Sequence, residues 1–444
     1  MKIRICLKNL MKKLPGIRKV VSRNEILEIQ LEKARHNAAL IGKEAVDYRL
    51  QLKGINKEKI NVVFVCHRPA VWESLHSVYN ALKSDGGFNV YIVAIPNKKE
   101  IPKLGLDHEV YESEGAEEFW KNYGCINGYN YETKEWFDLR KLAPDYIFFQ
   151  QPYNITRCEM YKSWNVASYA KICYVHYAYN FIGKGVLEET NPKDFIRDVS
   201  YYFTQNNIDN EMIKKILKRN SIYSVDVITT GFPRYDNIEK YKTSSAEAWD
   251  FSPKGNYRVM WTPRWCTNEG DCSFFDNKDV ITEYVLSNKD ISLLFRPHPQ
   301  AFSNWIRTGI MTENELNKYI EVYNNSENMR IDSRKEYFDT IFNSDCLISD
   351  ASSFIADYFL TGKPIIYCHK KDMFNELSRK MSEGFYWANN WKDIERILID
   401  LKNGKDELKV KRLQILSDLH IKDQNAGKMI ANILKCNNSR SGSL

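Results

Sequence analysis

Short apolar runs alternate along the chain with segments in which apolar residues recur at helical spacing. The run at residues 60–67, INVVFVCH, is followed by a helix-spaced segment at 70–84 and by a second run at 88–96. This order predicts a β-α-β unit, in which the two strands lie parallel. Runs of the same form, each ending in polar residues, return at 145–154, 171–180 and 200–206. The first half therefore predicts a parallel sheet covered by helices.

The second half repeats this pattern and predicts a second sheet. Strand-like runs occur at residues 226–236, 257–265, 291–299, 329–333, 346–350 and 363–368. A chain of 444 residues is longer than one hydrophobic core usually supports, so the expected fold class is α/β with two doubly wound, Rossmann-like domains. The expected divisions are a helical, basic segment at 1–55, a first domain at 56–240, a second domain at 241–436 and a polar tail at 437–444.

The start of the chain differs from the rest in charge. Eight basic residues and no acidic residue precede Glu25, and apolar side chains lie between them. This end should bind anions, either as a contact with an anionic membrane surface or as a solvated basic tail. A helix is expected at 24–51 with Asn24 as its cap, and Pro15 is expected to interrupt any longer helix.

Composition narrows the class of protein further. No apolar run approaches the roughly 18 to 20 residues that cross a bilayer, and no secretory cleavage pattern follows the basic start, so a cytoplasmic location is expected. The net charge of +7 comes without a basic stripe interleaved with stacking aromatic residues, which argues against nucleic acid as a partner. Ten scattered cysteines without a CxxC pair favour reduced thiols, and no metal or cofactor is expected.

The most informative stretch is CLISDASSFIADYFLTGKPIIY at residues 346–367. Its order is strand, hydroxyl turn, helix, glycine stop and strand. Ser352 and Ser353 would lie at the N-terminus of the helix, where unpaired backbone N–H groups favour a phosphate. Asp350 or either serine could instead simply cap the helix, but a cap explains one hydroxyl and not a run of them. The stretch therefore favours an anion site.

A second candidate is FRPHP, which places Arg296 and His298 two residues apart after the run at 291–295. If strand geometry persists that far, the two side chains project from one face. Arginine can clamp phosphate oxygens through two parallel N–H groups, and histidine can donate to a leaving oxygen near neutral pH. A strand-end histidine is more often structural, yet the neighbouring arginine and the serine turn favour a functional site.

Other strand ends add weaker candidates. TPRWC supplies Arg264, and YVHYAYN supplies His176, which could act as a general base toward a hydroxyl. The crevice of the first domain would also receive His67, Gln150 and Gln151, and the interdomain segment GFPRYD offers Arg234 and Asp236. These groups occur without a GxxxxGK[ST] loop, a complete GxGxxG fingerprint, an HExxH helix or a GxSxG elbow, which disfavours P-loop hydrolases, dinucleotide dehydrogenases, zinc peptidases and α/β-hydrolases.

Four pieces of the chain resemble, in the same order, the CDP-glycerol glycerophosphotransferase family of teichoic-acid-type polymerases and primases. The pieces are GFPRYD, VMWTPRW, LLFRPHP and LISDASSFIADYFLTGKPIIY. The last is the most specific, because its hydroxyl pair, Asp357 and Lys363-Pro364 all match. The resemblance covers roughly residues 170–370. It implies a GT-B architecture, in which two Rossmann-like domains face a cleft and the C-terminal domain holds the donor.

The resemblance also implies roles for individual residues. Ser352 and Ser353 would bind the donor phosphates with help from Arg264, while Arg296 and His298 would neutralise charge on the transferred phosphoryl group and the leaving CMP. His176 matches the family's histidine that deprotonates the acceptor hydroxyl, although the family's His-Gly-Thr is here His176-Tyr177-Ala178. Further cleft candidates are Arg234, Asp236, Asp350 and Asp357.

The implied reaction is transfer of glycerol phosphate from CDP-glycerol to a hydroxyl of a lipid-linked or polymer acceptor of the cell surface, a teichoic acid or a capsule. It would take place in the cytoplasm, at the inner face of the membrane. The strand-end residues leave alternatives open: a GT-B glycosyltransferase using a nucleotide sugar, a CDP-ribitol-dependent transferase, a sugar epimerase of related fold, or a binding module without catalysis. The acceptor and the oligomeric state also stay open.

Overall fold

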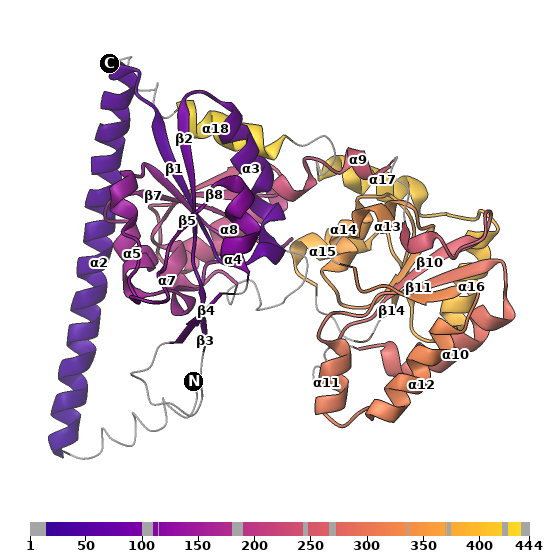
Figure 1. Ribbon diagram of the computed structural model, residues 1–444. Helices are drawn as coiled ribbons and strands as arrows, with labels where there is room; N and C mark the ends of the chain where they lie inside the picture. Colours follow the sequence, from indigo (N-terminus) through magenta and orange to yellow (C-terminus); the bar gives the residue numbers. More distant parts are fainter. Residues whose placement is uncertain are drawn as a thin grey trace.

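The computed structural model of the protein describes residues 15–99, 110–113, 115–179, 190–242, 247–265, 272–334, 337–368, 370, 374–419 and 425–436. These residues form two lobes, each built on a parallel sheet with helices packed around it (Figure 1). The basic positions predicted before residue 15 and the polar tail at 437–444 lie outside the described residues. No helix within the described ranges is both long and apolar enough to cross a membrane.

The first sheet has seven strands in the order β5-β2-β1-β6-β7-β8-β9. They are β1 (Ile60–Cys66), β2 (Phe88–Ala94), β5 (Ile126–Asn127), β6 (Tyr146–Phe149), β7 (Lys171–Val175), β8 (Val199–Thr204) and β9 (Asp226–Thr229), all pairing in parallel. The run at 226–236 supplies an edge strand of the first sheet, which agrees with the expected domain division at residue 240 and not with its grouping among the strands of the second half. Strand order reverses between β1 and β6, where an open α/β sheet forms its binding crevice.

The second sheet has the order β12-β11-β10-β13-β14-β15, with every pair parallel. Its strands are β10 (Tyr257–Thr262), β11 (Ile291–Phe295), β12 (Met329–Ile331), β13 (Cys346–Ser349), β14 (Ile365–Cys368) and β15 (Tyr386–Ala388). The sequence pattern predicted all of these except β15, a short edge strand. The reversal here lies between β10 and β13, so the loops after these two strands meet at one crevice.

Helices cover both sheets, and a two-stranded antiparallel ribbon, β3 (Asn97–Lys99) with β4 (Val110–Glu112), projects from the first lobe. The helices are α2 (Pro15–Asn56), α3 (Glu73–Ser84), α4 (Ala116–Trp120), α5 (Ser163–Val166), α7 (Lys193–Ile196), α8 (Asn207–Arg219), α9 (Glu239–Lys242), α10 (Phe274–Ser287), α11 (Ala301–Arg307), α12 (Glu313–Asn324), α13 (Phe338–Phe342), α14 (Phe354–Phe359), α15 (Glu376–Ser382), α16 (Trp391–Lys402), α17 (Lys409–Asp418) and α18 (Ala426–Cys436).

Helix α2 is longer than the sequence pattern predicts. It begins at Pro15, which the sequence analysis expected to interrupt a long helix. At the first helical position a proline costs nothing, because the backbone N–H that it lacks would have no intrahelical partner there. The helix lies against α5 and β7 of the first lobe, where Arg49 and Lys53 pair with the buried carboxylate of Asp145 at 2.7 and 2.6 Å.

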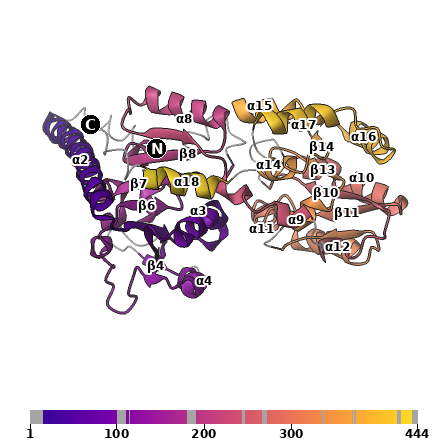
Figure 2. The ribbon, with the colours of Figure 1, turned by 90° about the horizontal axis from the view of Figure 1, so that it is seen from above.

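The position of helix α18 differs from the one expected from the division of the chain into domains. The helix was predicted to belong to the second domain, 241–436, but it packs against α3 of the first lobe, whereas α16 and α17 stay with the second (Figure 2). The Tyr146 hydroxyl donates to the Leu434 carbonyl at 3.3 Å, and Asp236 accepts from the backbone N–H groups of Ala426 and Gly427 at 2.9 and 2.8 Å. The apolar face of α18 packs into the hydrophobic core of the first lobe. Short-range sequence patterns do not predict such a long-range contact.

The contact between α18 and α3 depends on the absence of a side chain at Gly427. A Cβ atom there would lie 2.5 Å from the Ser77 carbonyl oxygen and 2.7 Å from its hydroxyl oxygen. We expect Gly427→Ala to destabilise the protein by about 1–3 kcal/mol, because backbone must move to admit the methyl group. The direction of this change in stability is informative, because Gly→Ala in an unhindered helix would stabilise the helix by up to ~1 kcal/mol.

Urea unfolding followed by circular dichroism checks this prediction. Gly86→Ala is the matched control, because a Cβ atom at Gly86 meets nothing within 4 Å. A lower unfolding midpoint for Gly427→Ala than for Gly86→Ala is expected, and coincident midpoints would contradict the close approach of the two helices.

Candidate active site

Asp350 organises the crevice between β10 and β13. This carboxylate is fully buried at the end of β13. Its Oδ1 accepts from the Arg264 backbone N–H at 2.5 Å, and its Oδ2 accepts from both the backbone N–H and the hydroxyl of Ser273 at 2.7 Å. Asp350, predicted as a cleft residue, therefore lies at the crevice but uses its oxygens to hold the two ends of the loop that follows β10.

The guanidinium group of Arg264 lies beside the serine turn. Its Nη1 donates to the Ala351 carbonyl at 2.8 Å, one residue before Ser352. The Ser352 hydroxyl accepts from the Phe354 N–H at 3.3 Å, while Ser353 is exposed at the N-cap position of α14 and its side chain makes no capping bond. Ser352 thus accepts from a backbone N–H at the start of α14, as a capping residue would. Arg264 and Ser353 supply hydrogen-bond donors at the same edge of the sheet.

His298 stacks on Trp265, with ring centroids 5.5 Å apart and planes inclined by 22°. Its Nδ1 accepts from the Gln300 backbone N–H at 3.2 Å, so the neutral ring carries its proton on Nε2. Partial burial, and then the nearby charge of Arg264, lower the pKa of His298. His298 therefore offers a neutral Nε2–H donor close to Arg264.

Arg296 does not project with His298, which corrects the sequence expectation. Its Nη1 binds the Asp332 carboxylate at 2.6 Å, its Nη2 donates to the Arg334 carbonyl at 2.7 Å, and its guanidinium lies 4.7 Å from the centre of the Tyr337 ring. Strand β11 ends at Phe295, so the alternation of a strand does not extend to His298. Arg296 turns toward the end of β12, whereas His298 turns toward the end of β10.

Arg234 and Asp357 form a buried link between the lobes. The Asp357 carboxylate accepts from the Tyr235 hydroxyl at 2.7 Å and from the Tyr337 hydroxyl, and Arg234 Nη2 lies 3.5 Å from it. Asp236, next along the chain, caps α18 as described above and also accepts from the Ser77 hydroxyl at 2.7 Å. These three cleft candidates hold internal contacts that fix the second lobe and α18 to the first lobe.

His176 lies at the carboxyl end of β7 in the first lobe and is 3% exposed. Its Nδ1 donates to the Ala178 carbonyl at 2.6 Å, which leaves the lone pair on Nε2. Nε2 is buried and has no hydrogen-bond partner within the described part of the chain. Burial lowers the pKa of His176 to about 4, so the ring is neutral near pH 7.

Tyr177 and Ala178, which stand where the family has Gly and Thr, both contact the imidazole of His176. The ring of Tyr177 stacks on that of His176 at 5.0 Å and 18°, and its hydroxyl lies 3.0 Å from that of Tyr153. The Ala178 carbonyl, besides accepting from His176, accepts from Gln205 Nε2 at 2.9 Å. The loop after β7 therefore clamps the imidazole in one orientation and one tautomer.

The crevice of the first sheet contains a second buried histidine. His67 Nε2 lies 3.0 Å from Gln151 Oε1, and Gln150 Oε1 accepts from the backbone N–H groups of His67 and Arg68 at 2.7 and 2.9 Å. Burial lowers the pKa of His67 to about 3. Together these side chains join the ends of β1 and β6.

Aromatic contacts connect the His176 loop with the second sheet. Tyr179 stacks on Tyr235 at 5.6 Å, and Tyr235 donates to Asp357 in α14, the helix that follows the serine turn. The two lobes therefore hold histidines with complementary chemistry: the buried Nε2 of His176 carries a lone pair, and Nε2 of His298 carries a proton.

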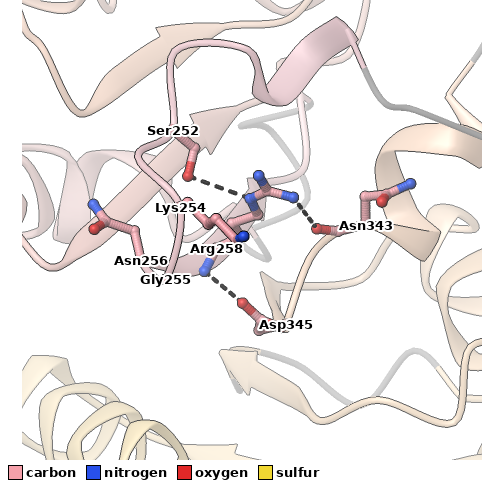
Figure 3. A pocket seen from close by; sticks show the side chains of 7 residues that line it. All are labelled: Ser252, Lys254, Gly255, Asn256, Arg258, Asn343 and Asp345. Atoms are coloured by element: carbon pink, nitrogen blue, oxygen red, sulfur yellow. Dashed lines mark hydrogen bonds between the residues drawn. The ribbon is translucent and has the colours of Figure 1, made fainter.

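A separate cavity of about 360 Å³ lies at the opposite edge of the second sheet (Figure 3). Its lining includes Arg258 near the start of β10 and Asp345 just before β13, and the Arg258 backbone N–H donates to Asp345 Oδ2 at 2.8 Å. Because the strands are parallel, this edge holds their amino ends and not the ends that carry Arg264 and Asp350. The cavity is thus distinct from the candidate site.

Several residues of the site were missed by sequence reasoning. Trp265 supports His298, Tyr337 contacts both Arg234 and Arg296, and Ser273 anchors Asp350. Asp332 closes a predicted strand and could have been suspected from that position, since strand ends had pointed to the other candidates. Nothing in the local pattern around Tyr337 or Ser273 signals a contact so distant in sequence.

Comparison with known proteins agrees with this architecture. Residues 176–387 match the model of the family CDP-Glycerol:Poly(glycerophosphate) glycerophosphotransferase. No curated protein sequence matched the chain. The match begins at His176 and includes the predicted catalytic and donor-binding residues, whereas the crevice candidates His67, Gln150 and Gln151 lie before it.

Solved structures resemble the chain in fold. The wall teichoic acid polymerase TagF matches with a TM-score of 0.50 and 14% identity, over 94% of this chain and 99% of that chain. The UDP-GlcNAc 2-epimerase from Neisseria meningitidis bound to UDP-GlcNAc matches with a TM-score of 0.57 and 14% identity, over 85% and 99%. The S. aureus MnaA–UDP structure gives 0.54 and 10%, over 85% and 96%. The predicted GT-B-like fold class is confirmed.

The family match and the two-sheet architecture agree with the motifs read from the sequence. Residues 176–387, just under half of the chain, match the CDP-glycerol:poly(glycerophosphate) glycerophosphotransferase family, and this match supports a CDP-glycerol glycerophosphotransferase enzyme.

Proposed function

We propose that the crevice between the two sheets transfers glycerol phosphate from CDP-glycerol to a hydroxyl of a lipid-linked cell-surface polymer. The observation that carries this proposal is the pair of neutral histidines, one on each lobe, that present opposite hydrogen-bonding nitrogens. Nε2 of His176 is a buried proton acceptor, and Nε2–H of His298 is a proton donor. Transfer of a phosphoryl group to a hydroxyl needs both, one for the nucleophile and one for the developing negative charge.

The donor would be bound by the second lobe. Arg264, Ser352 and Ser353 lie together after β10 and β13 and would hydrogen-bond the diphosphate. His298 Nε2–H would donate to an oxygen of the transferred or leaving phosphate. Arg296 would reach the diphosphate only by releasing Asp332, so we assign it to positioning the loops after β11 and β12 and not to direct contact.

In the proposed reaction the acceptor hydroxyl oxygen attacks the β-phosphorus, the one that carries glycerol. His176 Nε2 accepts the hydroxyl proton as the new P–O bond forms. The bond from the β-phosphorus to the bridging oxygen breaks, and its electron pair leaves with CMP. Positioning and electrostatic stabilisation by Arg264, His298 and the serine turn would supply most of the rate enhancement.

The acceptor and its membrane setting can be tested together. Purified protein would receive CDP-glycerol labelled in glycerol, with a lipid-linked glycerol phosphate primer in vesicles or with the same primer lacking its lipid. The proposal expects incorporation of label into the lipid-linked primer, with the protein cofloating with anionic vesicles. Equal incorporation into the lipid-free primer without cofloating would reject the lipid-linked, membrane-surface part of the proposal.

The buried position of His176 predicts an unusual pH dependence. Its pKa of about 4 lies below the ordinary 6.5, so the unprotonated base persists as pH falls through 6. At pH 5.5 about nine-tenths of an ordinary imidazole would be protonated, against about one in thirty for His176. We therefore expect kcat/KM for transfer to keep its neutral-pH value down to about pH 5 and to fall only near pH 4.

Initial transfer rates between pH 4.5 and 8, with CDP-glycerol well below saturation, measure this profile. Circular dichroism at each pH separates loss of the base from loss of the fold. An acidic limb centred near pH 6.5, with the fold intact, would show that the catalytic base is not this buried imidazole.

A further inference from the structure

Helix α2 has a second apolar face, whose bulky side chains are exposed in the described chain. Its inner face packs on the first lobe through buried Ala39, Val46 and Leu50. Gly42 fits the same face, where a Cβ atom would lie 2.3 Å from the Ala167 carbonyl oxygen. Figure 1 shows α2 running along one side of the first lobe and extending past it. The outer side of the helix is therefore open along its length.

Most of the exposed apolar residues of α2 follow one repeat. Between residues 24 and 55, steps of three and four residues alternate without interruption along one line of the helix, which we call the α2 seam. Alanines at 34, 38 and 45 belong to it, and its bulky members, which are 42–77% exposed, are Leu27, Leu31, Ile41, Tyr48, Leu52 and Ile55. A spacing of 3.5 residues is the a/d repeat of a two-stranded coiled coil.

We propose that the α2 seam pairs with α2 of a second copy of this chain in a parallel coiled coil. A seam of period 3.5 stays straight only when another helix of the same period winds around it. Side chains at a and d positions then insert between four residues of the facing helix. The repeat spans both the part of α2 that lies on the first lobe and the part that extends past it.

Asn24 fixes the orientation of the pair. It occupies an a position, and every other position of the seam after it is apolar. In a parallel pair Asn24 meets Asn24 of the partner subunit and the two amides hydrogen-bond, whereas an antiparallel pair would set it against an apolar residue. The parallel register also places Arg23 beside Glu28 of the partner subunit, an opposite-charge pair across the seam.

A membrane surface fits this part of α2 less well than a second copy. Residues 24–56 carry five acidic and five basic side chains, so they have no net charge to draw them to anionic lipid. Most of the basic groups also bind within the chain: Lys43 Nζ donates to the Val199 carbonyl at 2.7 Å, Arg35 lies over the Trp164 ring, and Arg49 and Lys53 hold Asp145.

Two matched double variants of the full chain test the pairing. Leu27→Glu with Leu31→Glu changes the seam, and Ile26→Glu with Ile29→Glu changes residues on other sides of the helix that are about equally exposed, at 50–53% and 55%. Sedimentation equilibrium at micromolar concentration should give twice the chain mass for the wild type and the second variant and a single chain mass for the first. A monomeric wild type, or equal dissociation of both variants, would overturn the proposal.

Disulfide trapping tests the orientation. Asn24→Cys should form a covalent dimer on mild oxidation, because the parallel register sets the two thiols face to face. Ile26→Cys, which lies off the seam, and the wild type with its native thiols are the controls. A dimeric protein whose Asn24→Cys variant gives no more cross-linked product than Ile26→Cys would reject the parallel arrangement.

Discussion

Replacing His298 with alanine is expected to lower the rate of CMP release from CDP-glycerol by about 10²- to 10³-fold, the usual loss when one preorganised donor to a developing charge is removed. The neutral Nε2–H of His298 lies next to Arg264 and is held by stacking on Trp265. Its contribution would be largest in the transition state, where negative charge grows on the leaving CMP. The fall should therefore appear in kcat, with little change in donor affinity.

Two further variants separate this role from a structural one. His298→Gln keeps an N–H donor at nearly the same reach, so it should recover part of the lost rate. Trp265→Phe keeps an aromatic platform and should leave most of the activity. If His298→Ala raised KM alone and kcat stayed at the wild-type value, His298 would bind the donor without acting on the transition state.

Replacing His176 with glutamine is expected to lower the rate of transfer by about 10²- to 10⁴-fold. This is the range for loss of a positioned general base. The Ala178 carbonyl holds Nδ1–H and leaves Nε2 as the acceptor, and glutamine has no side-chain nitrogen of comparable basicity. Binding of CDP-glycerol, which the second lobe would hold, should be unchanged. The measurement pairs single-turnover transfer to the acceptor with calorimetric titration of the donor.

His76→Gln serves as the control, because His76 lies on α3, outside the His176 loop, where its ring centroid lies 5.9 Å from that of Trp72 with the planes inclined by 38°. Its transfer rate should equal that of the wild type. A His176→Gln enzyme that still transfers glycerol phosphate at more than about one tenth of the wild-type rate would assign the base to another group, since a general base contributes at least 10²-fold in most enzymes.

The sequence pattern predicted the two parallel sheets because buried parallel strands read as short apolar runs, and both sheets have such strands. It failed where an element depends on distant partners. Strand β15 (Tyr386–Ala388) is too short to show a period, and α18 belongs to the first lobe through contacts with Ser77 and Tyr146 that lie hundreds of residues away. Local sequence patterns carry no information about contacts between residues so far apart in the chain.

The sequence predicted which residues lie at the candidate site, but it predicted less well where their side chains point. Strand ends identified Arg264, His298 and the serine turn, because parallel strands bring their carboxyl ends to one edge. The direction of Arg296 was wrong, since the strand ends before it and Asp332 draws its guanidinium toward β12. Asp236 and Asp357 were read as cleft groups, whereas their carboxylates satisfy backbone and tyrosine donors inside the molecule.

Transfer of glycerol phosphate from CDP-glycerol in this crevice can be tested by one competition between donors. Purified protein and acceptor would receive equimolar CDP-glycerol, CDP-ribitol and UDP-GlcNAc, and the released nucleotides and the modified acceptor would be quantified by chromatography and mass spectrometry. We expect CMP to be released in equal amount to the glycerol phosphate added to the acceptor, with no release of UDP or UMP. Release of UDP with sugar on the acceptor, or ribitol phosphate in place of glycerol phosphate, would contradict it.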